Sequence, residues 1–500
     1  MKTSRLFRGV HAMNIHIQKM WIYATILCVV FCVHSLLSQP RSQSFLTLRP
    51  PFQAGSPERE SLTRLELGGC QSVVQVVPLF GASTNSEDIA RYFMINGKSS
   101  LLVAGDGAVN VSLRDLSPDH FNIQTVEDTF RSRIQVEAKH EFSGAGLAWR
   151  KRLSDNWWME VSTPYVRVEN FMGFDEIILN KGGGSIAGTG LDNAPFVDSM
   201  TEAFRQSNWE FGKIDDRFSL VEDGFADVEV RFGYKTLAAD NIKIEGYVGF
   251  VFPTGNNPGA RYVFEPIVGN NGHYGFLYGS FTGIKLWEHS AHSIDLGIHL
   301  NTRYLFSNHQ IRSFDLKNKE FSRYIASYRT QQEANKAKDD LDVFGGTSGI
   351  NIYTQEVQVE PGFAISVMSS FLYRYKCLNI EAGYNFYARQ AEHLTIDWQE
   401  VPAVKDDGGL GNTNRARTMT DNFTGSSVPP EDYTPLQGKD LDLNSASTTS
   451  QLSYTFYGVF GWQVREGCTP TILGIGASYE VSINRGINQW MTWLKAEFFY

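Results

Sequence analysis

Charged side chains recur at every second position in several segments of the chain, and this spacing determines which chemical groups share one face of a strand. In residues 228–235, for example, Glu229, Arg231 and Lys235 alternate with apolar residues. Successive side chains of a β-strand point to opposite faces, so such a segment has one apolar face and one charged face. Charged groups enclosed by strands either line water or pair with one another, because an unpaired buried charge is too costly.

The residues that we expect to line this enclosed path carry both signs of charge, which predicts weak ion selectivity. For any single residue, structural pairing is the favoured alternative to a role in permeation. The pore-lining candidates are Arg133, Glu137, Lys139, Glu229, Arg231, Lys243, Glu245, Asp295, His299, Arg303, Glu381, Arg389, Glu480, Lys495 and Glu497.

Catalysis and metal binding are disfavoured. Barrel hydrolases use His with Ser or Asp, and His292, His299 and His309 lie near one predicted strand, but no motif of those enzymes surrounds them. The five cysteines include no C-x-x-C pair. We therefore expect no enzyme, no cofactor and no metal site.

The elements that must position the charged residues are strands separated by alternating short and long connections. The long connections are 170–224, 253–271, 307–353 and 396–449. Short turns on one side and long loops on the other are typical of outer-membrane barrels. The predicted strands are 134–150, 157–169, 225–235, 242–252, 272–287, 293–306, 354–375, 379–395, 450–464, 471–483 and 488–500.

The number of strands follows from their directions. If the short turns are periplasmic, one further strand must precede residue 134, and either Cys70 to Phe80 or Lys98 to Ala104 could supply it. This gives an even number, as single-chain bacterial barrels require. The predicted fold class is all-β, a transmembrane antiparallel up-and-down β-barrel of about 12 strands (12–14) with long extracellular loops.

Composition and the first residues suit an exported membrane protein. A net charge of −9 lacks the basic excess of a nucleic-acid binder. Met20 to Pro40 contains no Asp, Glu, Lys or Arg and follows a basic stretch, the plan of a signal peptide; an uncleaved anchor helix is the alternative. We expect residues 1–38 to be the signal peptide, 39–130 an N-terminal periplasmic segment with a probable first strand, and 131–500 the barrel.

Aromatic residues favour a membrane interface. Tryptophans gather beside the short turns, where an aromatic girdle should lie. Ordinary core tryptophan is the alternative, and two adjacent members cannot both face lipid. The girdle candidates are Trp149, Trp157, Trp158, Trp287 and Trp462.

The C-terminus is the most specific local signal. Counting back in twos from Tyr500 gives Phe498, Ala496 and Leu494 on one face, with Glu497 and Lys495 between them. This resembles the terminal strand of bacterial outer-membrane proteins. The resemblance implies that Phe498 and Tyr500 are an assembly signal for the barrel assembly machinery.

A second resemblance covers residues 224–290. The sequence Gly224-Phe225-Ala226-Asp227-Val228, two strands, then Phe252-Pro253-Thr254-Gly255 and the glycine-rich strand His273 to Trp287 resembles a group of outer-membrane channels. That group is named for the meta-cleavage pathway of phenol degradation and is distantly similar to long-chain fatty-acid transporters. The resemblance implies passive uptake of small molecules, hydrophobic ones among them.

Together these features predict a porin-like channel of the cell outer membrane for passive diffusion or uptake of small solutes. Its expected partners are outer-membrane lipid, the barrel assembly machinery and a small-molecule solute, with no nucleic acid. A surface-exposed structural or adhesion barrel without transport is the alternative, and a barrel hydrolase comes third.

Overall fold

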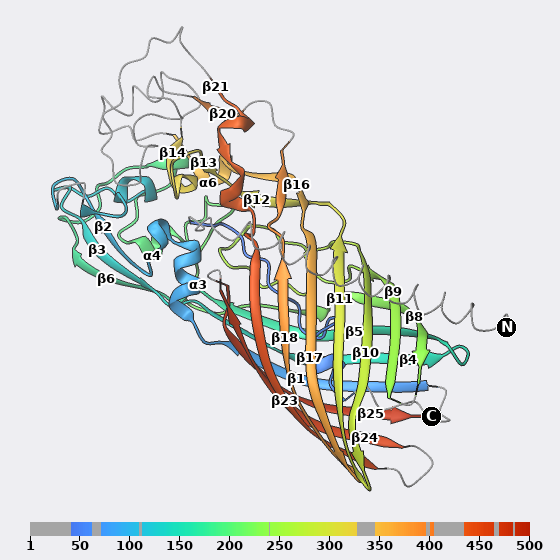
Figure 1. Ribbon diagram of the computed structural model, residues 1–500. Coiled ribbons are helices and arrows are strands. Elements are labelled where there is room, and N and C mark those ends of the chain that lie inside the picture. Colours follow the sequence, from blue (N-terminus) through green and yellow to red (C-terminus); the bar gives the residue numbers. More distant parts are fainter. Residues whose placement is uncertain are drawn as a thin grey trace.

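The computed structural model describes residues 42–62, 72–109, 113–239, 241–327, 346–396, 401–404, 435–464, 470–483 and 486–500. Twelve long strands close on themselves, and a mixed layer of short strands and helices covers one end of them (Figure 1). None of the helices in the described ranges has the length and apolar character needed to cross a bilayer.

The strands form one antiparallel barrel. The main sheet contains thirteen strands, of which β7 (Leu220–Phe225) pairs only with β5, and the other twelve close through the β4–β5 and β1–β25 pairs. The barrel strands are β1 (Ser72–Ser83), β4 (Lys139–Arg152), β5 (Trp157–Phe171), β8 (Val228–Ala238), β9 (Ile242–Phe252), β10 (Gly275–His289), β11 (His292–Leu305), β17 (Gly362–Tyr375), β18 (Leu378–Arg389), β23 (Gln451–Val464), β24 (Thr471–Ser482) and β25 (Gln489–Phe499).

The outer face of the barrel is apolar and the inner face is polar. In β25, Leu494 and Phe498 point outward and are exposed, while Lys495 and Glu497 point inward and are buried. Other exposed outward side chains, such as Phe371 and Phe456, continue this apolar surface around the barrel. A soluble protein rarely exposes so much contiguous apolar surface, and an apolar band around a polar lumen is the exterior of an outer-membrane barrel.

The strand count is confirmed, and the structure selects one of the two candidates for the first strand. Residues 72–83 form β1, which pairs with both β25 and β4 and so closes the barrel. The other candidate, Lys98 to Ala104, contributes β2 (Ser100–Ala104) to a separate three-stranded sheet with β3 (Arg131–Val136) and β6 (Phe174–Asn180).

The predicted strand 134–150 is wrong at its beginning. β3 ends at Val136 and β4 starts at Lys139, so the charged positions Arg133, Glu137 and Lys139 do not face the lumen. All three are exposed, whereas His140, Phe142 and Ala148 fill the inner face of β4. The sequence alternation was followed in the wrong phase, and shifting a strand by one residue exchanges its faces.

The barrel wall bends beside Pro164. β5 pairs with β8 from Trp157 to Ser162 and then with β7 from Tyr165 onward. Proline has no N–H to donate, so it fits the position where β5 changes partner. The carbonyl of Pro164 accepts from the Ala226 N–H at 2.9 Å. The motif 224–228 therefore forms the bend between β7 and β8.

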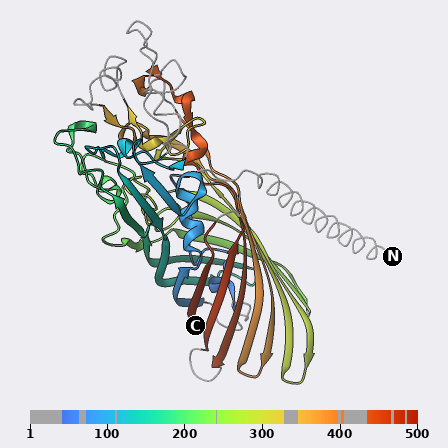
Figure 2. The same cartoon turned by 90° about the vertical axis from the view of Figure 1, so that its left-hand side faces the viewer.

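The remaining elements form a cap, made of the described parts of residues 84–136, 174–219, 308–360 and 393–446. Figures 1 and 2 show it at the end of the barrel opposite the short turns. Its apolar core includes Phe121, Trp209 and Tyr324. Its elements are α3 (Ser86–Phe93), η1 (Ile95–Gly97), β2, η3 (Pro118–Phe121), β3, β6, η4 (Leu191–Asn193), α4 (Met200–Ala203), β12 (Asn308–Ser313), β13 (Asp315–Leu316), η5 (Ser322–Tyr324), β14 (Ala326–Ser327), β15 (Thr347–Ser348), α6 (Gly349–Ile352), β16 (Thr354–Glu360), β19 (His393–Thr395), β20 (Val401–Val404), β21 (Pro435–Leu436), η8 (Gly438–Asp440), β22 (Leu441–Asp442) and η9 (Leu443–Ala446).

Residues 42–62, here called the lumenal segment, run from the cap into the barrel. Ser42 is held in the cap, because Arg323 donates to its hydroxyl oxygen at 3.0 Å and Asp315 in turn holds Arg323. At the other end, Leu62 packs against the inner wall beside Gly461 and Gly474. The only helix in the segment is the single turn α2 (Pro57–Glu60).

Candidate permeation path

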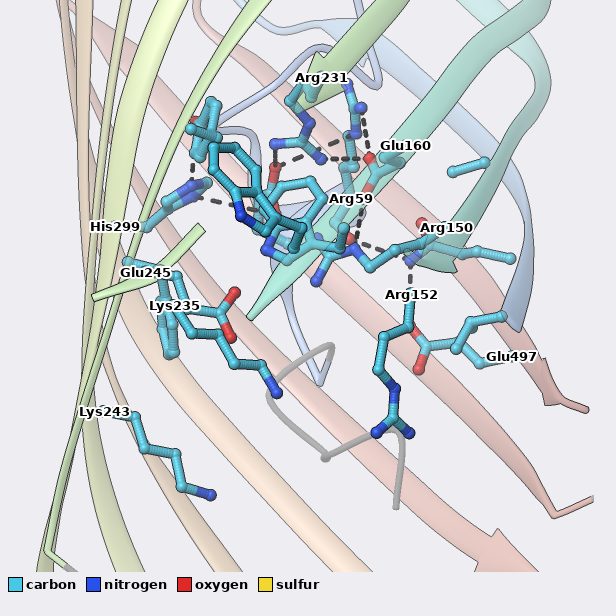
Figure 3. A pocket seen from close by; sticks show the side chains of 18 of the residues that line it. Arg59, Arg150, Arg152, Glu160, Arg231, Lys235, Lys243, Glu245, His299 and Glu497 are labelled. Carbon is cyan, nitrogen blue, oxygen red and sulfur yellow. Dashed lines mark hydrogen bonds and ion pairs between the residues drawn. The ribbon is translucent and has the colours of Figure 1, made fainter. Parts of the chain in front are cut away.

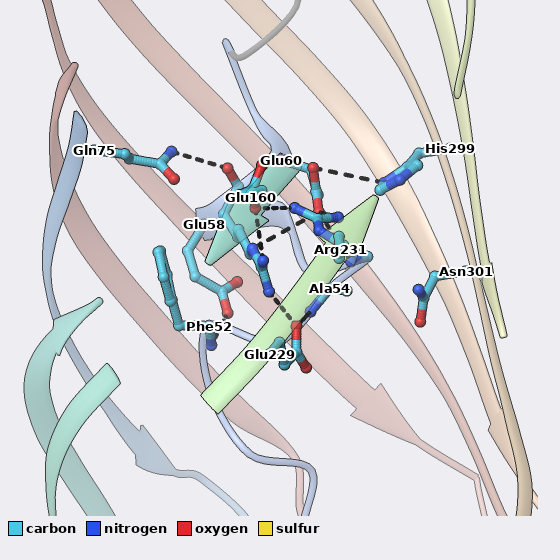
Figure 4. Close-up of polar contacts among 12 residues, drawn as sticks. Phe52, Ala54, Glu58, Glu60, Gln75, Glu160, Glu229, Arg231, His299 and Asn301 are labelled. Atoms are coloured by element: carbon cyan, nitrogen blue, oxygen red, sulfur yellow. Dashed lines mark hydrogen bonds and ion pairs between the residues drawn. The ribbon is translucent and has the colours of Figure 1, made fainter. Parts of the chain in front are cut away.

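Arg59 of the lumenal segment belongs to a buried ion-pair network. Figure 4 shows its members Glu60, Glu160, Glu229 and Arg231 close together. The Arg59 guanidinium donates to Glu160 of β5 at 2.7 Å and to Glu229 of β8. Arg303 of β11 donates to the other oxygen of Glu229. Glu160 also accepts from Arg150 at 2.8 Å. Arg59 thus contacts β5 and β8 directly, and β4 and β11 are joined to it through Glu160 and Glu229.

Glu60 extends the network toward the opposite wall. Arg231 donates to Glu60 at 2.9 Å and also to Glu160. His299 of β11 lies 3.9 Å from the second oxygen of Glu60, and its other ring nitrogen is 3.1 Å from the Tyr247 hydroxyl. All of these side chains are buried, so each charge is compensated by a partner rather than by water.

The backbone of the segment is held as well. Lys495 donates to the carbonyl of Arg59 at 2.8 Å, and the N–H of Leu62 donates to Glu381 at 2.8 Å. Glu229 accepts from the N–H of Ala54 at 3.1 Å. Because an extended segment has no ladder of its own, lumenal side chains satisfy its backbone groups.

Glycines on the inner face of the wall make room for the apolar side chains of the segment. A Cβ added at Gly146 would lie 2.3 Å from the ring of Phe52. A Cβ at Gly461 or Gly474 would lie 2.6 or 3.0 Å from Leu62. Close approach of another chain segment is a recognised reason for glycine in a strand.

The segment is less tightly enclosed nearer the cap. Residues 46–51 are half-buried, in contrast to residues 52–62, all of which are buried. Three small cavities, each of about 30 Å³, surround this stretch, and Pro50 lines all of them.

A larger cavity lies below the network, toward the short turns (Figure 3). It has a volume of about 140 Å³. Trp158, Tyr247 and Phe281 supply aromatic surface, while Lys235 and Glu245 bring charges into it. A cavity of this size accommodates a molecule of about one aromatic ring.

Most of the predicted pore-lining residues do lie in the barrel interior, which the charge alternation correctly indicated. The buried members are Glu229, Arg231, Asp295, His299, Arg303, Glu381, Arg389, Glu480, Lys495 and Glu497. Lys243 and Glu245 line the cavity near the short turns. Arg133, Glu137 and Lys139 are outside the lumen, as described above. A part in permeation stays a prediction for every one of them.

The three histidines considered for catalysis are not brought together. His292 begins β11, His299 lies in its middle and His309 belongs to β12 in the cap. Across the described ranges, no group of three or more His, Cys, Asp or Glu is arranged to hold a metal ion.

Four of the predicted girdle residues face outward and one does not. Trp157 is 51% exposed and pairs across the sheet with Tyr234, whereas the adjacent Trp158 is only 4% exposed and lies in the lumen over the Arg150 guanidinium. Trp158 is therefore removed from the girdle, because neighbours in a strand face opposite ways. Trp149, Trp287 and Trp462 point outward near the short turns, and Phe498 and Tyr500 are exposed on the outer face. Their interface and assembly roles stay predictions.

The lumenal segment itself was missed from the sequence. Its residues Arg59 and Glu60 carry no strand alternation, and three prolines, Pro50, Pro51 and Pro57, interrupt the region. The available signal was indirect: inward-facing glycines such as Gly146 and Gly474 left space that only another part of the chain could fill.

No protein-family model and no curated protein matches this chain. Among solved structures, an outer membrane channel from Pseudomonas putida F1 is similar at 10% identity over 86% of this chain and 96% of that chain, with a TM-score of 0.37. The Pseudomonas putida toluene transporter TodX is similar at 7% identity over 93% and 96%, with a TM-score of 0.31. The transport unit of the autotransporter AIDA-I from Escherichia coli is similar at 9% identity over 89% and 95%, also with a TM-score of 0.31.

Proposed function

We propose that this protein is an outer-membrane channel for small solutes, hydrophobic ones among them, whose lumen is closed by its own residues 42–62 and opens when that segment moves. The observation that carries the proposal is the ion-pair network of Arg59 and Glu60. It fixes a removable segment across an otherwise polar lumen, without any covalent bond among the contacts described.

The cavities on either side of the network support this function. Space for a small solute is present toward the short turns, small cavities of about 30 Å³ lie around Pro50 toward the cap, and the buried network separates the two. A solute that reaches the 140 Å³ cavity can go further only if residues 52–62 shift. Since both signs of charge line this path, weak ion selectivity is expected once it opens.

Planar-bilayer conductance tests the proposal. The refolded chain should be silent or open rarely, and a variant lacking residues 42–62 should give stepwise conductance. Heat-modifiable migration on a gel would establish that both barrels are folded. Silence of a folded variant lacking the segment would contradict the channel function.

The alternative, a structural or adhesion barrel without transport, is favoured by the cap. Its apolar core lies over the end of the barrel where loops of a channel would leave an opening. Liposome swelling in sugars and small aromatic solutes distinguishes the two, because only a channel admits solute after the lumenal segment is removed.

The sidedness expected from connection lengths makes the cap extracellular and the short turns periplasmic. Residues 84–130 lie in the cap, so they and the long connections occupy the same side, and a periplasmic location of these residues does not agree with extracellular loops. We propose the extracellular side for both. Membrane-impermeant thiol labelling of intact cells should modify a cysteine introduced at the exposed Asn180 of the cap and spare one at the exposed Ser290, between β10 and β11, with native cysteines replaced by serine.

A further inference from the structure

A small cavity in the upper lumen lies between the lumenal segment and the tops of the barrel strands. Thr47 and Pro50 of the segment form one side of it, and Asn270, Arg389 and Glu392 form the other. Its volume of about 30 Å³ holds roughly one or two water molecules or a single small ion.

Two side chains of this cavity have hydrogen-bond donors without acceptors. Arg389 is 6% exposed, and its Nε and Nη2 find no acceptor within the described ranges. Asn270 is 5% exposed; its Oδ1 accepts from Arg303 at 3.3 Å, but its Nδ2 finds no acceptor there either. Buried donors without partners cost free energy, and an ion or water that the chain itself does not supply is a common reason for them.

Two guanidinium groups share the carboxylate of Glu392, which lines the cavity. Glu392 lies 3.6 Å from Arg312 and accepts from the Thr47 hydroxyl at 2.6 Å and the Thr448 N–H at 2.9 Å. Burial raises the pKa of Glu392, but the guanidinium groups of Arg312 and Arg389 outweigh this effect and hold the pKa below its usual range. One carboxylate thus faces two guanidinium groups.

Other charged groups also lie near the cavity, among them the carboxylates of Asp227, near Arg303 and Asn270, and Glu265, near Arg312. Arg303 is already paired with Glu229. Burial lowers the pKa of His273, whose Nδ1 lies 2.8 Å from the Phe306 carbonyl oxygen and whose Nε2 lies 2.8 Å from Gln310 Nε2. Among the described residues, no carboxylate lies within ion-pair distance of Arg389. Glu392, which interacts with Arg389 at longer range, is paired with Arg312.

We infer that this cavity binds one small inorganic anion, chloride under physiological conditions, between Arg389 and Asn270. The cavity volume suits a monatomic anion, and the donors of Arg389 and Asn270 without acceptors belong to side chains that line it. Because Thr47 and Pro50 form one wall, the anion stabilises the upper part of the lumenal segment against the barrel. This inference goes beyond the channel function and does not depend on it.

Thermal unfolding of the detergent-solubilised full chain in sodium chloride and in sodium gluconate, at equal ionic strength, tests the inference. The unfolding midpoint should rise saturably with chloride, and the rise should be lost in Arg389→Gln. Arg374→Gln is the matched control, because Arg374 is paired with Asp295 at 2.9 Å and does not line the cavity. A chloride dependence that persists in Arg389→Gln, or that Arg374→Gln removes equally, would overturn the assignment.

Crystals of the unaltered chain soaked in sodium bromide give a second measurement that does not require the variant to fold. An anomalous difference peak within hydrogen-bond distance of Arg389 and Asn270 is the expected result. Water alone in the cavity, without anomalous signal, would refute the anion site whatever the conductance experiments show.

Discussion

The two halves of the lumenal segment are held in different ways. Residues 52–62 are buried throughout, with Arg59 and Glu60 inside a network of wall charges. Residues 46–51 are half-buried and bordered by small cavities. Under the proposed function, residues 52–62 hold the lumen closed, and we call them the lock. Residues 46–51 connect them to the cap, and we call them the tether.

The largest expected effect is at the centre of the lower half. Arg59→Ala leaves Glu160 and Glu229 short of a partner, and removing one member of a buried pair costs about 3–5 kcal/mol. We expect a lower unfolding midpoint and stepwise conductance in planar bilayers, where the unaltered chain is silent. Arg59→Lys should recover part of the stability, because it keeps a positive charge beside Glu160 and Glu229. An Arg59→Ala chain that stays closed would show that the network does not hold the lumen closed.

The next largest loss of stability is expected for a substitution in the barrel wall opposite the lumenal segment. Gly146→Ala places a Cβ 2.3 Å from the Phe52 ring, and overpacking of this kind costs about 1–3 kcal/mol. Urea unfolding should show the loss. In a Phe52→Ala chain, Gly146→Ala should cause little further loss, because the ring that the new Cβ would meet is absent. Gly246→Ala is the control, since its nearest neighbour, the Gly279 carbonyl, is 4.0 Å away. Equal losses of stability in Gly146→Ala and Gly246→Ala would contradict the packing of Phe52 against Gly146.

A smaller effect is expected at Gly55, in the lower half above Arg59. The carbonyl of Gly55 accepts from Ser366 at 2.7 Å, from Asn385 at 3.1 Å and from Arg49 at 3.3 Å. Ser366→Ala removes one of these three bonds, and a typical hydrogen bond contributes about 0.5–1.5 kcal/mol to stability. The unfolding midpoint should fall slightly without new conductance. The control Ser369→Ala changes a half-buried serine of the same strand that faces away from the lumen. Stepwise conductance of the Ser366→Ala variant would show that the contacts of Gly55, and not only those of Arg59, keep the lumen closed.

The barrel could be predicted from the sequence because the alternation of apolar and polar residues is a local property of each strand. Alternation along each strand places Lys495 and Glu497 inward and Leu494 and Phe498 outward whatever lies in the lumen. The rule failed where a strand was interrupted, as at residues 137–138 between β3 and β4.

The partners of the inward charges could not be predicted in the same way. Glu160 and Glu229 meet Arg59 across sequence separations of 101 and 170 residues, and that contact depends on the segment entering the barrel. Nothing in the local pattern of residues 42–62 specifies such a position. The position of the segment is nevertheless reflected in the barrel wall, where glycines lie opposite Phe52 and Leu62.

The smallest effect is expected in the upper half, at Arg49. Its guanidinium donates to Asn385 at 2.9 Å and to the Gly55 carbonyl at 3.3 Å, and it lies 4.5 Å from the centre of the Tyr387 ring. Since Arg49 is half-exposed and belongs to no ion pair among the described residues, Arg49→Ala should cost only about 0.5–1 kcal/mol. The variant should remain closed in planar bilayers, with an unfolding midpoint close to that of the unaltered chain. Arg49→Ala and Arg59→Ala remove the same side chain type ten residues apart, so similar conductance from both would show that the segment is held as one unit and that the division into lock and tether is wrong.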